Sequence, residues 1–228
     1  MCIAVMKSKW YNFRKSGPKK VTYGLSNRMS APIVIDAKGH IQGRLAAAVA
    51  KQLLKGRKIV VVRAEEIVLN GKHKFTVHTY ERFLNKTTNS NPRDGPFHQR
   101  APREIFARAV RGMLPYKTHR GAEAFENLKV FEGVPAKYVT YKRVVIPHAL
   151  RCVSIHTDRP TTKLGELSTT MGWKYGKVVA DLEAKRKAES AKYYEAKKAQ
   201  QDKKAAAIEK ANKQLGAQAV KFLETFAE

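Results

Sequence analysis

The sequence predicts an α/β fold, in which helices cover a small parallel sheet and a long helical extension follows. Two observations support this prediction. Early in the chain, two short runs of β-branched residues enclose a helical pattern within about thirty residues, and such a βαβ unit has parallel strands and a right-handed crossover. Beyond residue 174, the composition changes to that of one long helix.

The predicted βαβ unit begins at residues 33–36 (IVID), whose β-branched side chains suit a buried strand. Residues 45–56 (LAAAVAKQLLKG) then place their apolar side chains at helical spacing, and we expect this helix to end at Gly56. Residues 58–63 (KIVVVR) contain the uninterrupted apolar run of a second strand that is buried on both faces.

Helix patterns and turn signals alternate in the middle of the chain. Residues 78–84 are predicted to be helical, and residues 87–96 form a loop by their Asn, Pro and Gly content. Pro102 suits the first turn of another helix, where the Glu104 carboxylate complements the helix dipole.

The helix that begins at Pro102 is predicted to have an apolar face and a basic face. At about 100° per residue, the apolar face consists of Ile105, Phe106, Ala109, Val110 and Met113. The opposite arc of about 140° carries Arg100, Arg103, Arg108 and Arg111. We expect Pro115 to close this helix, a short helix to cover residues 119–127, and a strand to cover residues 128–131.

Residues 174–215 are predicted to form one helix, about 60 Å long at 1.5 Å per residue. Its apolar stripe runs from Val178 to Leu182 and is thin afterwards. The helix is therefore expected to dock on the body at its start and to project beyond it. Four apolar residues at helical spacing within 216–228 predict a further docking segment.

Charge divides the chain into a basic N-terminal tail (1–31), an α/β body (32–150), a connecting segment (151–173) and a basic helical extension (174–228). Residues 1–28 contain seven Lys and Arg and no acidic residue, so this segment has no means of folding alone. A transit peptide is a second interpretation of the tail. A third is an extension that precedes the usual start at Met29.

The net charge of +26 on 228 residues requires a polyanionic partner, either nucleic acid or an anionic membrane surface. No apolar run approaches the roughly 20 residues needed to span a bilayer, so we expect no membrane-spanning segment. The two cysteines are too few for a disulfide framework, which favours a reducing compartment.

The sequence gives little support for a catalytic or cofactor-binding site. Gly39 and Gly43 follow the first strand, but their spacing fits neither a dinucleotide-binding nor a P-loop motif. We expect them to permit a tight turn and close helix packing, while Arg44 remains able to meet an isolated phosphate. The histidines show no metal-ligand spacing, and Cys152 is expected to be a buried structural thiol. An enzyme stays possible, but no residue pattern names its chemistry, and we expect no metal, no cofactor and no small-molecule substrate.

Nucleic-acid binding has positive support in residues 82–120, which hold nine Lys and Arg against two acids, interleaved with aromatic residues and histidines. Arginine makes bidentate phosphate contacts and stacks on planar groups, and aromatic rings provide stacking platforms. A second basic cluster covers residues 141–151. The predicted RNA-binding residues are Arg44, Arg82, His98, Arg100, Arg103, Arg108, Arg111, Lys117, His119, Arg120, Lys142, Arg143 and Arg151.

Seven collinear blocks between about Ile33 and Lys192 carry a specific likeness, among them GPFHQRAPREIF, AVRGMLPYKTHRG and KLGELSTTMGWKYGKVVADLEAKRK. The AVRGMLP block, residues 109–115, is the most diagnostic of them. In these blocks the sequence resembles the universal large-subunit ribosomal protein thirteen family in its eukaryotic cytosolic form. Residues 1–28 depart from that family, whose members usually begin close to Met29.

The resemblance implies a three-layer α/β/α body with a mainly parallel four-stranded sheet, no enzymatic activity, and a structural role on large-subunit rRNA beside neighbouring ribosomal proteins. It also implies that the basic helix face and the loops on either side contact the RNA, and that the C-terminal extension runs toward rRNA or neighbouring proteins. It implies cytosolic ribosomes as the location, with assembly in the nucleolus. Two alternatives stay open, a free RNA-binding regulator that uses the same surface and a nucleotide-dependent enzyme.

Overall fold

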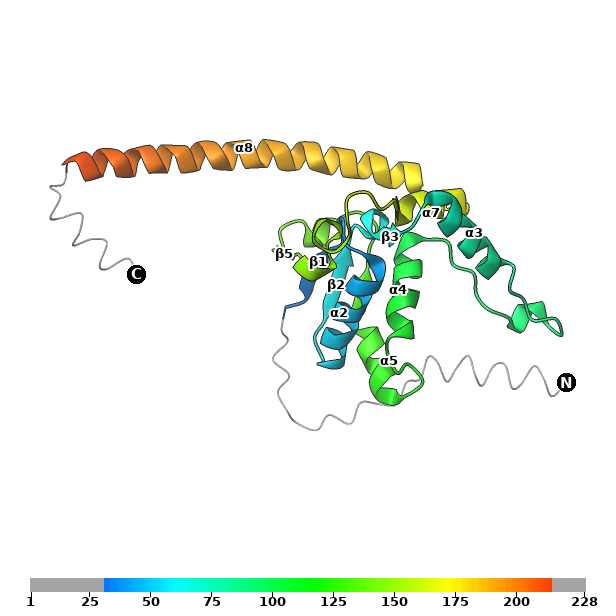
Figure 1. Ribbon diagram of the computed structural model, residues 1–228. Helices are drawn as coiled ribbons and strands as arrows, with labels where there is room; N and C mark the ends of the chain where they lie inside the picture. The colour runs from blue at the N-terminus through cyan, green and yellow to red at the C-terminus, as the bar shows by residue number, and fades with distance from the viewer. Residues whose placement is uncertain (1–30, 215–228) are drawn as a thin grey trace. The chain divides into compact units, whose positions relative to one another are not determined.

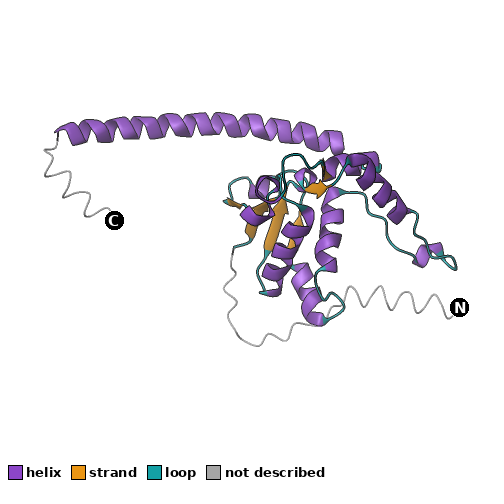
Figure 2. Cartoon of the chain, viewed as in Figure 1, coloured by secondary structure: helices purple, strands orange, loops and turns teal. Residues whose placement is uncertain are grey.

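A four-stranded parallel sheet forms the centre of the computed structural model, which describes residues 31–214. The predictions for the N-terminal tail and for the apolar residues of 216–228 lie outside the described residues. The strand order is β4-β2-β1-β5 (Figures 1 and 2). The strands are β1 (Ile33–Asp36), β2 (Ile59–Val62), β4 (Leu128–Val130) and β5 (Arg143–Val144).

Seven α-helices surround or extend this sheet in the described part of the chain. They are α2 (Gln42–Leu54), α3 (His73–Leu84), α4 (Pro102–Gly112), α5 (His119–Glu126), α6 (Arg151–Ser154), α7 (Leu164–Thr170) and α8 (Gly176–Gln214). Short 3₁₀ helices lie at Ala64–Glu66, Pro92–Asp94, Ala136–Tyr138 and Pro147–Ala149. The fold class predicted from the sequence is confirmed.

The predicted βαβ unit is present, because β1 and β2 are parallel with Ile33 paired to Ile59 and α2 connects them. The main core lies on the sheet face that carries Ile35 and Val61, where α2, α4, α5 and α7 contribute buried side chains. The other face has a small cluster of Val34, Val60 and Val62 under Tyr138 of a 3₁₀ helix. The layer on this second face is therefore much thinner than the first.

A second, two-stranded antiparallel sheet pairs β3 (Val68–Asn70) with β6 (Thr161–Lys163). The sequence did not predict it. Each strand has three residues, too few to show an alternating pattern. The two strands are also far apart in the chain, so no hairpin signal connects them.

The end of α4 differs from the prediction. Phe106 and Val110 are fully buried as expected, but Met113 follows the last residue of the helix and its side chain is 45% exposed. Leu114 takes its place in the core, with 4% exposure. The helical phase of about 100° per residue ceases to apply once the helix ends at Gly112.

Leu114→Ala is expected to lower the free energy of unfolding by about 2–5 kcal/mol, because it removes a buried side chain and leaves a cavity. Met113→Ala is expected to lower it by less than about 1 kcal/mol, as for an exposed position. Urea unfolding of the two variants measures both. A larger loss at Met113 than at Leu114 would contradict the observed packing.

Two smaller predictions are also wrong. Cys152 lies in the short helix α6 with an exposed thiol, so it is not a buried structural cysteine. Gly39 has φ +70°, as the predicted tight turn requires, whereas a Cβ added at Gly43 would meet no atom within 4 Å. Close helix packing is therefore not the reason for the second glycine.

The long helix α8 docks on the body through its first turns only. Glu183 accepts hydrogen bonds from the Val134 amide at 3.0 Å and from the Arg186 Nη2 at 2.7 Å, and Val179 lies on the same side of the helix. Every residue from 187 to 213 is exposed (Figure 1, yellow to orange-red). Within the predicted apolar stripe, Val179 is half-buried, but Val178 and Leu182 are more than half exposed, because Glu183 and Arg186 occupy the side of the helix that faces the body.

Within residues 31–214, none of the helices combines the length and the apolar character that crossing a bilayer requires.

Candidate nucleic-acid interface

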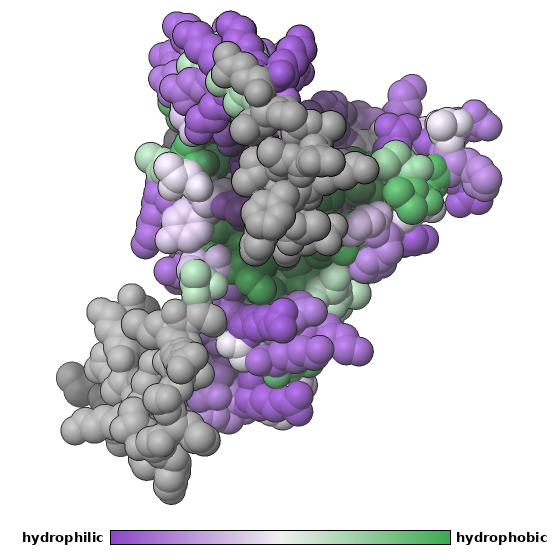
Figure 3. All heavy atoms as spheres, turned by 90° about the vertical axis from the view of Figure 1, so that its left-hand side faces the viewer, coloured by the Kyte–Doolittle hydropathy of each residue, from purple (hydrophilic) through white to green (hydrophobic). Residues whose placement is uncertain are grey.

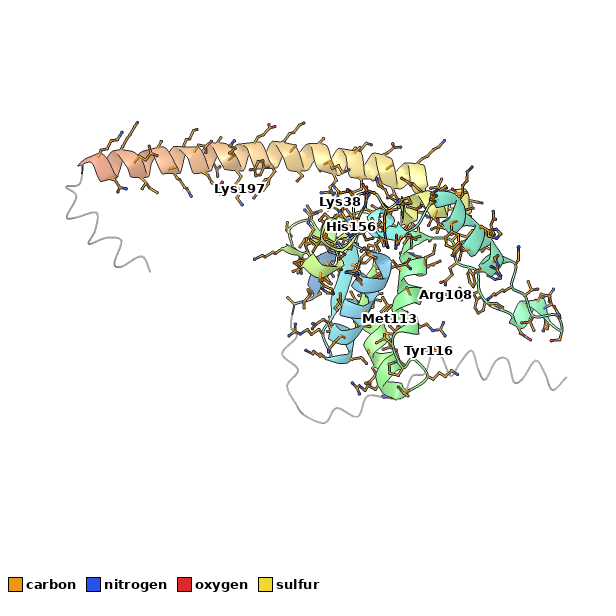
Figure 4. The ribbon with its side chains drawn as sticks, in the orientation of Figure 1. Lys38, Arg108, Met113, Tyr116, His156 and Lys197 are labelled. Atoms are coloured by element: carbon orange, nitrogen blue, oxygen red, sulfur yellow. The ribbon has the colours of Figure 1, made fainter. Side chains whose placement is uncertain are left out.

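The four arginines predicted on one helix face are all exposed, and we call Arg100, Arg103, Arg108 and Arg111 the arginine surface. Arg103, Arg108 and Arg111 lie on α4, whereas Arg100 precedes the first residue of the helix, Pro102. The backbone of this surface is fixed by the opposite face of α4, where Phe106 and Val110 are fully buried. Because α4 is held in one orientation on the core, its arginines are presented on a rigid element. In Figure 4, Arg108, Met113 and Tyr116 follow one another down α4 and the turn beyond it.

Two members of the arginine surface lie over aromatic rings. The Arg108 Cζ is 3.8 Å from the centroid of the Phe83 ring, and the Arg111 Cζ is 4.2 Å from the centroid of the Tyr116 ring. Stacking restricts each guanidinium to a few orientations and leaves its N–H groups at the edge free to donate. The arrangement suits a planar or bidentate anionic group, such as a phosphate.

A hollow of about 390 Å³ adjoins these arginines and is lined by Arg108, Arg111, Phe97, Phe125 and neighbouring residues. Phe97 is 80% exposed at the rim, which leaves its ring available for stacking. The hollow thus combines guanidinium donors with an open aromatic face. Arg82, the other predicted residue nearby, lies exposed on α3 next to Phe83 in the chain.

His98 is less available than the sequence suggested. Its ring packs edge-on against Phe83 with centroids 4.9 Å apart, and its Nε2 is buried without a hydrogen-bond partner among the described residues. Tyr80 ties the same loop to α3 by donating to the Gln99 carbonyl. Burial raises the pKa of the Tyr80 phenol, against the opposing charges of Arg108 and Arg100. The phenol therefore remains a neutral donor.

Acidic groups limit one edge of the arginine surface. Arg103 Nη2 lies 3.5 Å from the Glu104 carboxylate, and the Arg103 amide donates to Glu132 at the same distance. Burial raises the pKa of Glu132, although the Arg103 amide and charge oppose the shift. Arg103 is thus partly neutralised within the protein, whereas Arg108 and Arg111 face no ion-pair partner among the described residues.

Lys117 lies in the turn after α4, and His119 and Arg120 begin α5; all three residues are exposed. Thr118 caps α5 by accepting from the Gly121 amide at 3.3 Å. A Cβ at Gly121 would lie 2.1 Å from the Pro115 carbonyl oxygen, so only glycine allows this close approach. The His119 Nδ1 is 3.6 Å from the Glu123 carboxylate.

Arg120 and Arg111 line different hollows. Arg120 lines its hollow with Lys51 and Lys55 of α2 and with Met113. Arg120 therefore does not connect the turn with the arginine surface. That connection is made by the contact between Arg111 and Tyr116.

Arg44 and Arg151 lie on a separate part of the body. The Arg44 Nη1 donates to the His148 carbonyl at 3.4 Å, and Arg151 is exposed at the start of α6. Arg44 lines a hollow of about 230 Å³ together with His156 and Arg159. His156 and Arg159 were not among the predicted RNA-binding residues, and the basic turn HTDRP at 156–160 is a weak signal that points to them.

Lys142 is exposed, but Arg143 is committed to an internal ion network. Its Nη1 lies 3.8 Å from Asp36, whose carboxylate also accepts from Arg63 Nε at 2.8 Å and from the Lys38 amide at 3.2 Å. The Asp36 and Arg63 side chains are only 11% and 13% exposed. Arg143 is therefore a weaker candidate for a nucleic-acid contact than Lys142.

The one fully buried histidine among the described residues has a structural role. His40 Nε2 accepts from the Ile146 amide at 3.1 Å, and its Nδ1 lies 3.1 Å from the Lys38 carbonyl. Burial lowers the pKa of His40, which outweighs hydrogen bonds to its ring and the charge of Asp36. The ring is thus neutral and links two loops.

The part of the chain that the structure describes holds no group of three or more His, Cys, Asp or Glu side chains placed to bind a metal. A hollow of about 620 Å³ lies where α7 and the start of α8 meet the Ala64–Glu66 turn. Glu65 in its wall accepts from the Gly133 amide at 2.9 Å, and Glu183 is paired with Arg186. None of the predicted RNA-binding residues lines this hollow.

Two comparisons with known proteins identify relatives of this chain. The sequence profile of the family described as ribosomal protein L13 matches residues 30–137. The large ribosomal subunit protein uL13 of Dictyostelium discoideum is 56% identical over 162 residues, which cover 71% of this chain and 87% of that protein. The large ribosomal subunit protein uL13 of Caenorhabditis elegans is 52% identical over 175 residues, 77% of this chain and 85% of that protein.

Proposed function

Because the chain belongs to the ribosomal protein L13 family, we propose that it is a structural constituent of the large ribosomal subunit that binds large-subunit rRNA through the arginine surface. The turn with Lys117 and His119, the edge with Lys142, and the cluster around Arg44 and Arg151 provide further contacts. The chain performs no catalysis in this role and needs no cofactor. Its other partners are neighbouring ribosomal proteins.

The observation that carries this proposal is the pair of arginines stacked on Phe83 and Tyr116 beside the open ring of Phe97. Folded rRNA is recognised mainly through its shape, its phosphates and its 2′-hydroxyl groups. A rigid surface of pre-oriented guanidinium groups fits those features better than a closed pocket does. The net charge of +26 supplies the long-range attraction to such a polyanion.

This function places the protein on cytosolic ribosomes after assembly in the nucleolus. Sucrose-gradient sedimentation of a cell lysate tests the first part. The protein is expected to travel with large subunits at physiological salt and to leave them only at high salt, because phosphate contacts release counterions. A protein that sediments mostly as a light, free species at physiological salt would instead be an RNA-binding regulator.

A further inference from the structure

A hollow of about 490 Å³ lies where α2 meets the chain that leads from α4 into α5. In the part of the chain that the structure describes, four apolar residues and three cations line it, and no acidic residue does. It is separate from the hollow beside the arginine surface, which different residues line. We call it the Met113 hollow, and its lining residues are Ala47, Ala50, Lys51, Leu54, Lys55, Met113 and Arg120.

The α2 side of the Met113 hollow has the pattern of a surface that packs against another helix. Residues 47, 50, 51, 54 and 55 follow the i, i+3, i+4, i+7, i+8 spacing of one helix face. Ala47 and Ala50 have small side chains, so a second helix can approach α2 closely at that end. Since residues 47 and 55 are eight apart, the face extends over about 12 Å, or about two helical turns.

Met113 contributes an apolar contact from outside α2. Leu114 takes its place in the core, so the Met113 side chain is left 45% exposed at the lower end of α4 (Figure 4). Methionine is flexible and polarisable, which allows it to adapt to the surface of a binding partner. Met113 and the half-buried Leu54 therefore offer apolar area that the described part of the chain leaves partly uncovered.

The three cations of the hollow are available to a partner. Lys51 and Lys55 are exposed on α2, and Arg120 is exposed at the start of α5. Among the described residues, none of the three has an ion-pair partner. Charge complementarity therefore favours a partner that brings carboxylates to both sides of the apolar lining.

A nucleic acid fits the Met113 hollow less well than a protein does. Its described lining residues include no aromatic ring, so a base finds no stacking platform there. Phosphates would pair with the cations but would leave the apolar side chains in contact with water. In Figure 3, the end of α8 at the top is almost entirely hydrophilic, whereas hydrophobic residues are exposed on the body below it. The apolar area that a protein would cover thus belongs to the body.

The chain itself does not supply a suitable partner segment. A second copy would bring the same basic hollow and a net charge of +26, so like charges would face each other. Residues 1–28 contain seven Lys and Arg and no acidic residue, which makes them equally unsuitable. The partner is therefore a different protein with an excess of acidic residues.

We infer that the Met113 hollow binds an acidic, amphipathic helix of a protein partner. Apolar side chains on one face of that helix enter the hollow between Leu54 and Met113, as in other complexes of a helix with a groove. Its carboxylates pair with the cations on either side. This inference goes beyond the proposed rRNA binding, because it gives Arg120 a protein contact and leaves the arginine surface free. One chain can thus hold rRNA and an acidic protein at the same time.

The test measures binding of the full chain to two acidic model peptides by fluorescence anisotropy. Both peptides have about 15 residues and the same content of glutamate, leucine and alanine. In the faced peptide the leucines share one side of the helix, and in the scrambled peptide they are distributed around it. Because the two peptides carry the same charge, the ratio of their affinities reports the apolar contact.

The unchanged chain is expected to bind the faced peptide about 10-fold more tightly than the scrambled one. Met113→Glu places a carboxylate in the apolar lining and should reduce this ratio to less than about twofold. Val139→Glu is the matched control, because Val139 is 46% exposed and does not line the hollow. It should keep the full ratio. A chain without preference for the faced peptide, or the same ratio in all three proteins, would overturn the inference.

Two triple variants decide between a protein and rRNA as the occupant, and they keep the test valid if Met113→Glu alters folding. The hollow triple consists of Lys51→Gln, Lys55→Gln and Arg120→Gln. The control triple removes three other exposed lysines of the body and consists of Lys72→Gln, Lys74→Gln and Lys86→Gln. Both triples remove the same charge.

The hollow triple is expected to bind the faced peptide about 5- to 30-fold more weakly than the control triple does, from three charge pairs at the edge of an interface. The two triples should bind deproteinised large-subunit rRNA within about threefold of each other. A loss of rRNA binding confined to the hollow triple would assign the hollow to the rRNA interface and overturn the inference. The proposed function would stand in that case, because its own test is the binding of rRNA by Arg108 and Arg111.

Discussion

Reversing the charge of the two stacked arginines, with Arg108→Glu and Arg111→Glu together, is expected to weaken binding to deproteinised large-subunit rRNA by about 100- to 1,000-fold. Each loses a charged hydrogen-bond contact of roughly 1.5–2 kcal/mol, and the pair therefore accounts for about 3–4 kcal/mol. Folding should persist, because both side chains are exposed and stack on their rings from outside. Anisotropy measures binding, and circular dichroism measures folding.

Two further variants test whether the loss of affinity depends on the position and on the geometry of these arginines. Lys72→Glu with Lys74→Glu makes the same charge change in exposed positions at the start of α3, where acids favour the helix dipole. It should lower affinity much less. Arg108→Lys with Arg111→Lys keeps the charge but loses bidentate geometry, so an intermediate loss is expected. An unfolded double reversal, or equal losses in the two charge-matched variants, would show that the arginine surface has no special part in binding.

The orientation of α4 could be predicted from the sequence because helical periodicity applies along its whole length. Phe106 and Val110 are buried and the three arginines within the helix, Arg103, Arg108 and Arg111, are exposed, as the pattern required. Arg100 is also exposed, but it precedes the helix. The prediction failed at Met113, one residue beyond the helix, where the chain turns and Leu114 enters the core instead. Periodicity carries information only within a regular element.

Contacts between distant segments could not be predicted in the same way. The stacking of Arg108 on Phe83 joins α4 to α3, and nothing in either segment alone specifies the partner. The same holds for the docking of α8, which depends on Glu183 meeting the Val134 amide. The amphipathic stripe favoured Val178 and Leu182 for that contact. The contact is instead made by the buried carboxylate of Glu183, which accepts hydrogen bonds from three donors. Polar networks of this kind have no local sequence signature.

Asp36 is the clearest case of such a network, and it lies at the carboxyl end of β1. Its carboxylate is bound by Arg63 through two hydrogen bonds and lies near Arg143 on β5. Arg63 itself has φ 58°, a left-handed conformation that a non-glycine residue rarely adopts. The network therefore holds an unfavourable backbone conformation in place while it connects β1 with the strands beside it.

Asp36→Asn is expected to lower the free energy of unfolding by about 3–5 kcal/mol at neutral pH, because it leaves two partly buried guanidinium groups without their counter-charge. Burial acts to raise the pKa of Asp36, but the hydrogen bonds from Arg63 and Lys38 and the charges of Arg63 and Arg143 outweigh it and lower the pKa below its ordinary value. Urea unfolding of the full chain at a series of pH values measures the difference.

The pH dependence distinguishes an ionic role of Asp36 from a merely steric one. A lowered pKa in the folded state means that the ionised carboxylate stabilises the fold above the pKa of the unfolded chain, near 3.9. That stabilisation disappears as the pH falls through the lower folded value. The unfolding free energies of the unchanged chain and Asp36→Asn should therefore converge in acid. Asp158→Asn, at an exposed carboxylate, should differ little from the unchanged chain at any pH. A difference at Asp36 that stays constant from neutral to acidic pH would contradict the ion network, because only loss of the carboxylate charge can close it.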